Sequence, residues 1–473
     1  MEQILIKGAQ LILALSLLVV IHEFGHYLFA RIFGIRADNF FLFFNPGFSI
    51  VRYDPLTKKW SFFKKNMTEE EKLERTKLVK KRNAENGRAS WRDTIYGIGW
   101  VPLGGYVAIG GMIDESMDKT QLAEPVHPTD FRAKPAWQRF FVMFGGVLFN
   151  FILAIIIYAG IAFCWGEKYI PYDRITEGMD FSKPAIEAGF RNGDIPLMAD
   201  GEQVLASDPE NIYKIVNAKE VKVLRNGKDT VSISLPENFI LQLNESGFMA
   251  IRIPVIVAGI LPGEPAEKAG IQKGDRIVAV GDSLTPSFSE FGPALIAYSG
   301  KEVPMKVIRD GKEILVNSTP TEDGKLGIQL TPPTDIYDTE VIEYGFFSSI
   351  PKGISDGTNK LVTYVSSLKY LFTKSGAQSL GGFGSIGNMF PERWSWLSFW
   401  EITAFLSVIL AFMNILPIPA LDGGHIVFVV WEMITRRKPS EKVLEKAQIV
   451  GLLFLVLLLI YANANDIYRF LIK

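Results

Sequence analysis

The sequence has 473 residues, of which 21% are charged, and it contains a single cysteine, Cys164. This length exceeds that of one ordinary soluble domain, and one cysteine excludes an internal disulfide framework. The formal net charge of -1 provides no bulk attraction to polyanions, so nucleic acid is excluded as an expected partner.

Apolar residues gather in four long stretches, whereas the middle of the chain has the composition of a soluble protein. A membrane-spanning helix needs about 20 predominantly apolar residues. Three stretches exceed this length, and the fourth reaches it only with flanking residues. The sequence therefore predicts a multi-pass α-helical membrane protein with four transmembrane helices, in contact with the lipid bilayer. The stretches are Ile4–Phe33, Phe140–Trp165, Leu397–Ile434 and Ile449–Ala462.

The first stretch carries His22, Glu23 and His26 within its apolar sequence. It is longer than the apolar core of a signal peptide and lacks a basic start, so we expect it to remain as a membrane helix. Residues i and i+4 share one face of a helix, so both imidazoles are able to bind one metal ion. Zinc suits imidazole and hydrolysis, and Glu23 is then a candidate general base. An ionised side chain at mid-membrane costs about 2.5–3.5 kcal/mol, which favours a function over simple helix packing.

Charge around the stretches predicts their orientation. Basic residues outnumber acidic ones across residues 31–136, and Arg436–Lys438 follow the third stretch. Lys and Arg next to membrane helices favour the cytoplasmic side. We therefore expect both termini and the acidic segment 166–396 on the outer side of the membrane.

The soluble middle contains an internal repeat. The Pro-Ala, Ala-Gly and Gly-Asp pattern of Pro184–Asp194 recurs 81 residues later in Pro265–Asp275. In the same order, Val223–Lys228 is echoed by Val307–Lys312. The pattern predicts a duplicated module of about 80 residues. Both copies resemble PDZ domains, which are α+β modules that bind peptides by strand addition. A steric gate or spacer without a ligand is an equal alternative, and Pro196 is expected to interrupt a strand ladder.

The third stretch is broken by prolines and glycines between Asn414 and His425. Irregular backbone at membrane depth is tolerated where it lines a cavity or is buried in protein. Catalytic zinc usually has three protein ligands, so Asp422 is a candidate third ligand, with His425 as its competitor. The remaining histidine, His127, lies in a loop-like segment and is expected at the surface. Counted from the outer end of each helix, His22 and Asp422 both fall toward the cytoplasmic side.

Together, the segments His22–His26 and Asn414–His425 resemble the two motifs of the site-2 protease family of intramembrane zinc metalloproteases. The paired PDZ-like modules between the second and third stretches make the chain similar to its bacterial RseP group, the regulator-of-sigma-E proteases. The resemblance implies that Glu23 is the general base and that His425 is not a ligand. It implies three ligands for one Zn²⁺ per chain, namely His22, His26 and Asp422.

The resemblance also implies residues that hold substrate. Gly145–Asn150 is similar to the family's Gly-Pro-x-x-Asn motif, with Gly146 in place of the proline, and Trp100–Val107 is similar to its membrane-re-entrant β segment. A strand edge beside the zinc would pair with a substrate helix that has unwound. The residues expected to bind substrate are Asn150, Asn414, Pro417, Pro419, Gly104, Gly105, Tyr106 and Val107.

The implied activity is hydrolysis of peptide bonds in the transmembrane segments of single-span membrane proteins, such as anti-sigma factors or signal-peptide remnants. This is regulated intramembrane proteolysis at the bacterial inner membrane, with periplasmic PDZ domains and an active site toward the cytoplasm. The PDZ pair would admit substrates that another protease has already trimmed. A membrane metal-ion transporter and a non-catalytic PDZ scaffold are the alternatives. The glutamate next to His22 and the PDZ pair fit a transporter poorly, and the intact ligands and Glu23 argue against a non-catalytic scaffold.

The motifs and the resemblance together imply a sequence of eight regions. In chain order they are a first membrane helix (1–36), a cytoplasmic-side loop with the re-entrant β segment (37–136), a second membrane helix (137–166), two PDZ domains (172–250 and 251–333), an extracytoplasmic juxtamembrane region (334–396) with amphipathic helices, a third membrane helix (397–435) and a fourth (447–466).

Overall fold

The computed structural model describes residues 2–102, 104–112, 126–208, 211–237, 239–243, 247–368 and 381–468. The chain forms two compact units. The first holds the chain up to Trp165 and again from Tyr344, and the second holds Gly166–Glu343. Residues 113–125 of the expected cytoplasmic loop and 369–380 of the expected juxtamembrane region lie outside the described residues.

Within the described ranges, four helices of the first unit are long and apolar enough to cross a membrane. This confirms the predicted fold class at the level of a four-helix membrane protein that also contains β-rich parts. The four spans are Glu2–Ile32 (α1), Ala136–Trp165 (α3), Trp396–Ile415 (α12) and Lys442–Ile467 in α14 (Glu441–Ile467).

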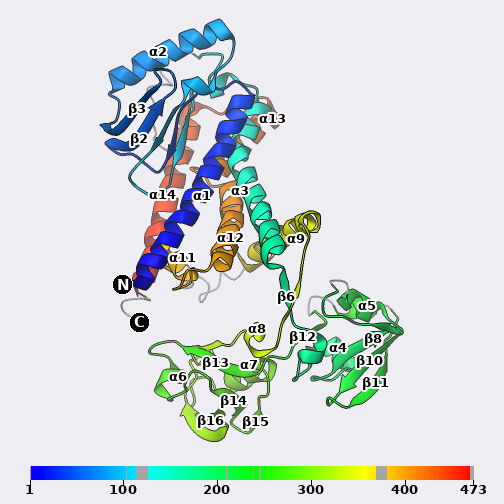
Figure 1. The fold of residues 1–473 in the computed structure, drawn as a ribbon. Coiled ribbons are helices and arrows are strands. Elements are labelled where there is room, and N and C mark those ends of the chain that lie inside the picture. Colours follow the sequence, from blue (N-terminus) through cyan, green and yellow to red (C-terminus); the bar gives the residue numbers. More distant parts are fainter. Residues whose placement is uncertain are drawn as a thin grey trace. The chain divides into compact units, whose positions relative to one another are not determined.

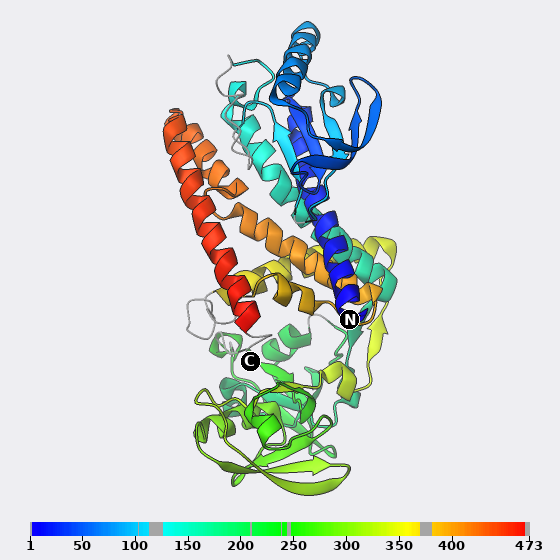
Figure 2. The ribbon, with the colours of Figure 1, turned by 90° about the vertical axis from the view of Figure 1, so that its left-hand side faces the viewer.

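Helix α3 is the centre of the first unit, because α1, α12, α9 (Phe346–Ser367) and α13 (Asp422–Thr435) all pack against it (Figure 1). In Figure 2, α12 lies between α1 and α14. Leu18 of α1 packs with Phe399 of α12, and Ala154 of α3 packs with Val408 of α12. The same clusters contain Ala14 of α1, Ala154 of α3 and Ala404 of α12, and small residues of this kind let membrane helices approach closely.

The predicted third span consists of two helices. Helix α12 ends at Ile415, and α13 begins at Asp422. Pro417 and Pro419 lack the backbone N–H that would continue the helix, so the chain turns between the two segments. Residues 416–421 therefore interrupt the region 397–435 within the segment where the sequence indicated a break, and Asp422 opens the helix that follows.

A five-stranded sheet and a charged helix follow α1. The sheet has the order β3-β2-β4-β1-β5, with β1 parallel to β4 and the other neighbours antiparallel. Helix α2 (Glu69–Asn86) begins with a capping box between Thr68 and Glu71. The strands are Ala37–Leu42 (β1), Phe48–Asp54 (β2), Lys59–Lys65 (β3), Ile95–Ile98 (β4) and Tyr106–Ile109 (β5), with the short helices Trp91–Asp93 (η1) and Phe131–Ala133 (η2) nearby.

The first repeat of the second unit forms a four-stranded sheet of order β11-β10-β8-β9 and a separate β12–β7 pair. Its core gathers Phe190, Ile215, Val221 and Val223. The elements are Met179–Phe181 (β7), Lys183–Glu187 (α4), Ile195–Ala199 (β8), Glu202–Gln203 (β9), Asn211–Asn217 (α5), Glu220–Arg225 (β10), Asp229–Ser234 (β11), Phe239–Gln242 (η4) and Met249–Ile251 (β12).

The second repeat forms a sheet of order β17-β16-β14-β13-β18, with β15 paired to β14. Strand β6 (Glu167–Tyr169) pairs with β19 (Glu340–Ile342). The short helix η3 (Tyr172–Arg174) follows β6 in the chain. The elements of the repeat are Val255–Ile260 (β13), Pro265–Lys268 (α6), Arg276–Val280 (β14), Ser283–Leu284 (β15), Phe288–Ala297 (α7), Val303–Arg309 (β16), Lys312–Ser318 (β17), Ile328–Leu330 (β18) and Pro333–Ile336 (α8).

The two repeats share an ion pair at the same place. Arg225 donates through Nε and Nη2 to the carboxylate of Asp194, and Arg309 donates in the same way to Asp275. Both aspartates are 1% exposed. The duplication read from the sequence therefore extends to matching strands and matching contacts.

Pro196 does not end its strand, although the ladder to β10 is irregular beside it, as expected. It lies inside β8 opposite Val223, where the register shifts between Lys222 and Val223. Strand β14 shows a register shift at the corresponding place, between Ile277 and Ala279. An irregular position in a ladder has no need of the missing N–H, so proline is tolerated there.

Helix α9 is amphipathic, as expected for the juxtamembrane region. Its Gly353 lies against α3, where an added Cβ would stand 2.6 Å from the backbone nitrogen of Ala159. Phe346 and Phe347 at its start are exposed. After residues 369–380, the chain continues in α11 (Phe383–Met389).

Candidate metal centre and active site

Three side chains from distant parts of the sequence come together in the first unit. His22 Nε2 lies 3.2 Å from Asp422 Oδ2, and His26 Nε2 lies 3.3 Å from the same oxygen. The two Nε2 atoms are 3.2 Å apart. Among the described residues, these three form the group of His, Cys, Asp or Glu side chains that is placed to hold a metal ion.

The triangle of ligand atoms has the size that zinc requires. With zinc–ligand distances near 2.0–2.2 Å, two ligands of a tetrahedral ion lie about 3.4 Å apart. The observed separations of 3.2 to 3.3 Å agree with this value. Asp422 Oδ2 is buried without a hydrogen-bond donor in the described part of the chain, and a bound cation would satisfy it. The donor set of two imidazoles and one carboxylate fits zinc.

Two glycine contacts bring α1 against α3 at this level. A Cβ atom on Gly25 would stand 2.3 Å from the carbonyl oxygen of Gly145, so the two backbones touch. A Cβ atom on the next residue, Gly146, would stand 2.5 Å from both His22 Cε1 and His26 Nε2. Helix α3 therefore forms the floor beneath both imidazoles, and the position that the family motif gives to proline is occupied by a residue without a side chain.

His26 is held in the tautomer that a metal ligand needs. Its Nδ1 lies 2.8 Å from the carbonyl oxygen of Val142 in α3. A carbonyl only accepts, so Nδ1 carries the proton and Nε2 presents its lone pair toward Asp422.

Asn150 of α3 lies against His22. Its Nδ2 atom is 3.3 Å from His22 Nδ1, and its Oδ1 atom is buried without a hydrogen-bond partner in the described part of the chain. Rotating this fully buried amide by 180° would let Oδ1 accept the Nδ1 proton of His22, which would leave His22 Nε2 free as a ligand. The hydroxyl of Ser407 in α12 donates to the Asn150 backbone carbonyl at 2.7 Å and fixes this part of α3.

Asp422 is positioned by the break between α12 and α13. Ala420 has a φ of 80°, in the left-handed region that residues with side chains rarely adopt. Gly423 and Gly424 pack against the backbone of residues 415–419, where an added Cβ would stand 2.1 Å and 2.6 Å from carbonyl oxygens. This strained, closely packed turn is typical of a functional site and directs the carboxylate toward α1.

Glu23 lies beside the ligand group, close to both imidazoles and to Asp422. Its carboxylate also lies close to the backbone of Val107 in β5. Gly105, just before β5, packs against Val19 of α1, since an added Cβ would stand 2.9 Å from its side chain. The structure therefore places the start of β5, predicted as a substrate-binding edge, next to the candidate general base.

The other two histidines lie apart from the ligand group. His425 Nε2 is 3.5 Å from Gln448 Nε2 of α14, in a small hollow with Pro419 and Phe428. His127 Nδ1 lies 2.8 Å from Thr129 Oγ1 in a partly exposed turn.

The remaining candidate substrate residues lie around the break. Asn414 is in the last turn of α12, and Pro417 is exposed. Pro419 packs against Gly451 of α14, where an added Cβ would stand 1.6 Å from its carbonyl oxygen. Tyr106 stacks on Phe41 of β1 and donates to Asn45.

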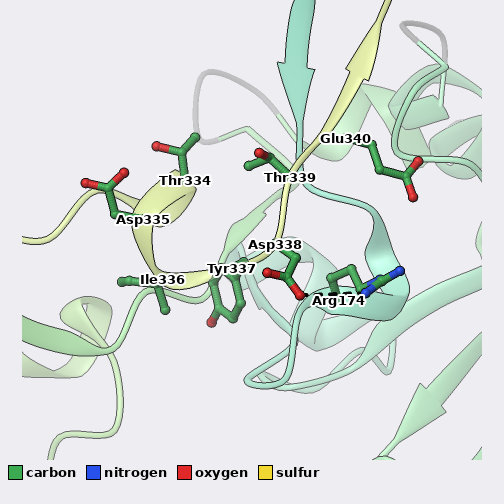
Figure 3. A pocket seen from close by; sticks show the side chains of 8 residues that line it. All are labelled: Arg174, Thr334, Asp335, Ile336, Tyr337, Asp338, Thr339 and Glu340. Carbon is green, nitrogen blue, oxygen red and sulfur yellow. Dashed lines mark ion pairs between the residues drawn. The ribbon is translucent and has the colours of Figure 1, made fainter.

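A separate polar hollow of about 470 Å³ lies in the second unit (Figure 3). It is lined by Arg174 and residues 334–340, and Arg174 Nη1 lies 3.7 Å from Asp338 Oδ2. It contains none of the predicted site residues, so it is not part of the candidate active site.

The chain matches the family described as Peptidase family M50 over residues 10–62 and 86–458. The chain belongs to peptidase family M50. The regulator of sigma E protease of Haemophilus influenzae is 28% identical over 492 residues, covering 97% of this chain and 98% of the relative. Protease RseP of Yersinia pestis is 27% identical over 504 residues, covering 99% and 100%. A Neisseria meningitidis protein that carries the name zinc metalloprotease is 26% identical over 487 residues, covering 97% and 98%.

The family predicted from the two motifs is thereby confirmed for this M50 peptidase. Three contacts at the site were not predicted from the sequence. They are the contact of the Val142 carbonyl with His26, the packing of Gly25 on Gly145, and the position of Gly146 beneath the imidazoles. The signal for the last two was a pair of small residues facing each other on membrane helices. The Val142 carbonyl had no signal, because every residue has one.

Proposed function

We propose that this chain is an intramembrane zinc endopeptidase that hydrolyses peptide bonds within transmembrane segments of single-span membrane proteins. Its class, a zinc metalloprotease of family M50, follows from the family match and from the names of its relatives. The observation that carries the proposal is the triangle of His22, His26 and Asp422, with Glu23 beside it. This group lies in the unit that contains the four candidate membrane spans.

Each residue of the group has its own role in the proposed reaction. His22, His26 and Asp422 would hold the ion, and a zinc ion bound there would supply Lewis acidity toward water and the scissile carbonyl. Glu23 accepts a proton from the attacking water and passes it to the nitrogen of the leaving amine, so it ends the cycle as a carboxylate. The backbone of Val107 lies beside this carboxylate.

The substrate must be extended, since a helix hides its peptide bonds in intramolecular hydrogen bonds. Strand β5 is one of the two edge strands of its sheet, and its Val107 lies beside Glu23. An unwound segment pairing with this edge would bring a carbonyl to the metal. We therefore assign Gly104, Gly105, Tyr106 and Val107 to the substrate clamp.

The residues at the break and in α3 complete the proposed site. Asn414, Pro417 and Pro419 surround the turn that carries Asp422, where a substrate would pass. The contact of Asn150 with His22 makes it a positioning residue first, and a substrate-binding residue only if a substrate reaches it.

The proposal also assigns a role to the two repeats and a location to the enzyme. The two PDZ-like modules of the second unit face the periplasm and limit access to substrates that another protease has shortened. The enzyme lies in the bacterial inner membrane, with its zinc toward the cytoplasmic side. One relative carries the name regulator of sigma E protease, so anti-sigma factors are the first substrate class to test, followed by signal-peptide remnants.

Glu23→Gln in the full-length protein tests the proposal. A single-span membrane protein is incubated with the purified enzyme, and zinc per chain and cleavage are both measured. We expect one zinc in both forms and a loss of cleavage of at least about 100-fold in Glu23→Gln. Glu70→Gln, at an exposed position of α2, serves as control. Wild-type cleavage by Glu23→Gln would refute the role of Glu23, and a metal-free wild-type enzyme with full activity would refute the proposal itself.

A further inference from the structure

The outer strand β3 exposes aromatic and basic side chains together. Trp60, Phe62 and Phe63 are 62%, 65% and 72% exposed. Residues 58–66 contain no acidic residue, and the lysines have no ion-pair partner in the part of the chain that the structure describes. The four exposed lysines are Lys58, Lys59, Lys64 and Lys65.

Phe63 adds backbone strain to this edge. Its φ of 49° lies in the left-handed region, which is rare for a bulky side chain. The ladder between β2 and β3 pairs Lys64 with Ser49 and Phe62 with Val51, and it skips Phe63. Strain of this kind persists where the position has a use, so an aromatic ring held outward here calls for a partner.

The register of the sheet links β3 to the strand that lies beside the candidate general base. One row of paired residues crosses from β3 to β5, namely Trp60, Tyr53, Tyr96, Phe40 and Val107. Val107 contacts Glu23, which lies about 32 Å along α1 from Glu2 at 1.5 Å per residue. The hydrocarbon core of a bilayer is about 30 Å thick. In Figure 1, β2 and β3 lie at the same level as the C-terminal part of α1.

We propose that β3 and the turn before it bind anionic phospholipids of the cytoplasmic leaflet. Trp60, Phe62 and Phe63 enter the boundary between head groups and acyl chains, which aromatic residues favour. The lysines extend to the phosphates, because their long side chains lie along apolar surface while the charge stays at the interface. The negative potential of the cytoplasmic leaflet matches this cluster of uncompensated positive charge.

A lipid surface explains the edge better than a second copy of the chain does. Lysines along an edge strand oppose pairing with another strand. The left-handed Phe63 also interrupts the regular row of backbone groups that strand addition needs.

Photo-cross-linking of the full-length protein tests the proposal. A benzophenone amino acid replaces Phe62, and the protein is placed in vesicles of phosphatidylcholine and phosphatidylglycerol in a two-to-one ratio. We expect lipid adducts in which phosphatidylglycerol exceeds its share of the bilayer several-fold, and less so at high salt. The same probe at Leu78, which is 56% exposed on α2, is expected to give none.

Charge variants separate lipid recognition from mere proximity. The double substitution Lys64→Gln with Lys65→Gln is expected to lower the preference for phosphatidylglycerol at least about fivefold. The matched pair Lys77→Gln with Lys81→Gln on α2 should leave it unchanged. Absence of lipid adducts at position 62, adducts mainly to a second copy of the chain, or a preference that the β3 lysines do not affect would each overturn the proposal.

Discussion

Gly146 of α3 lies against the ring of His26 in α1, with space for no side chain between them. A Cβ atom there would stand 2.5 Å from His26 Nε2, far inside van der Waals contact. We expect Gly146→Ala to displace an imidazole and to weaken zinc affinity about 10–100-fold, the effect typical of disturbed outer contacts at metal sites. Competition with a chromophoric chelator measures the affinity.

Gly160→Ala is the matched control for this substitution. Gly160 lies in the same helix, and nothing lies within 4 Å of a Cβ added to it. Zinc affinity equal in Gly146→Ala and Gly160→Ala would show that the imidazoles do not rest on α3.

Asn150 offers a test that separates two roles. If its amide orients His22, Asn150→Ala should weaken zinc binding about 10–100-fold and lower cleavage in parallel. If it holds substrate instead, cleavage should fall while zinc affinity stays at the wild-type value. Gln10→Ala is the control, because Gln10 is equally buried in α1 but donates to the Pro391 carbonyl, away from the metal site.

The ion pair between Arg139 and Glu432 ties α13, and therefore Asp422, to α3. Both side chains are little exposed, so removing one charge leaves the other poorly solvated. We expect Glu432→Gln to speed amide hydrogen exchange in α13 and to weaken zinc binding about tenfold. Glu392→Gln breaks the exposed pair with Lys7 and should leave both quantities unchanged. Faster exchange without weaker zinc binding would mean that the pair stabilises α13 but does not position Asp422.

The ligands themselves could be predicted because their signals are local or chemically rare. His22 and His26 are one helical turn apart, so their shared face follows from helix geometry alone. Asp422 stood out because a carboxylate beside prolines and glycines at membrane depth needs an explanation.

What could not be predicted depends on contacts between distant segments. The sequence around residue 415 signals a break, but it does not say that a new helix begins at Asp422 itself. That Val142, and not a neighbouring residue, meets His26 depends on the rotation of α3, which the touching backbones of Gly25 and Gly145 set. The exposed aromatic edge of β3 depends on which strand is outermost, and that order is a property of the whole sheet.

Asp275 provides a test of the duplicated module through pH. Hydrogen bonds from Arg309 hold the pKa of the Asp275 carboxyl below its ordinary value. A carboxyl whose pKa is lower in the folded state than in the unfolded one stabilises the fold above its unfolded pKa of about 3.9. This contribution is lost as the pH falls from there through the folded pKa, because protonation then favours unfolding.

We therefore expect hydrogen-exchange protection of β13–β18 to fall as full-length protein is taken below about pH 4, after correction for intrinsic rates. Asp275→Asn should lower the unfolding free energy of this module by about 2 kcal/mol at neutral pH, and the difference should shrink toward low pH. Asp282→Asn, at an exposed position, is the control. The first repeat keeps its own Asp194–Arg225 pair, so at each pH its hydrogen-exchange protection should be the same in wild type and in Asp275→Asn. Parallel pH profiles for wild type and Asp275→Asn would mean that the carboxylate does not stabilise the module.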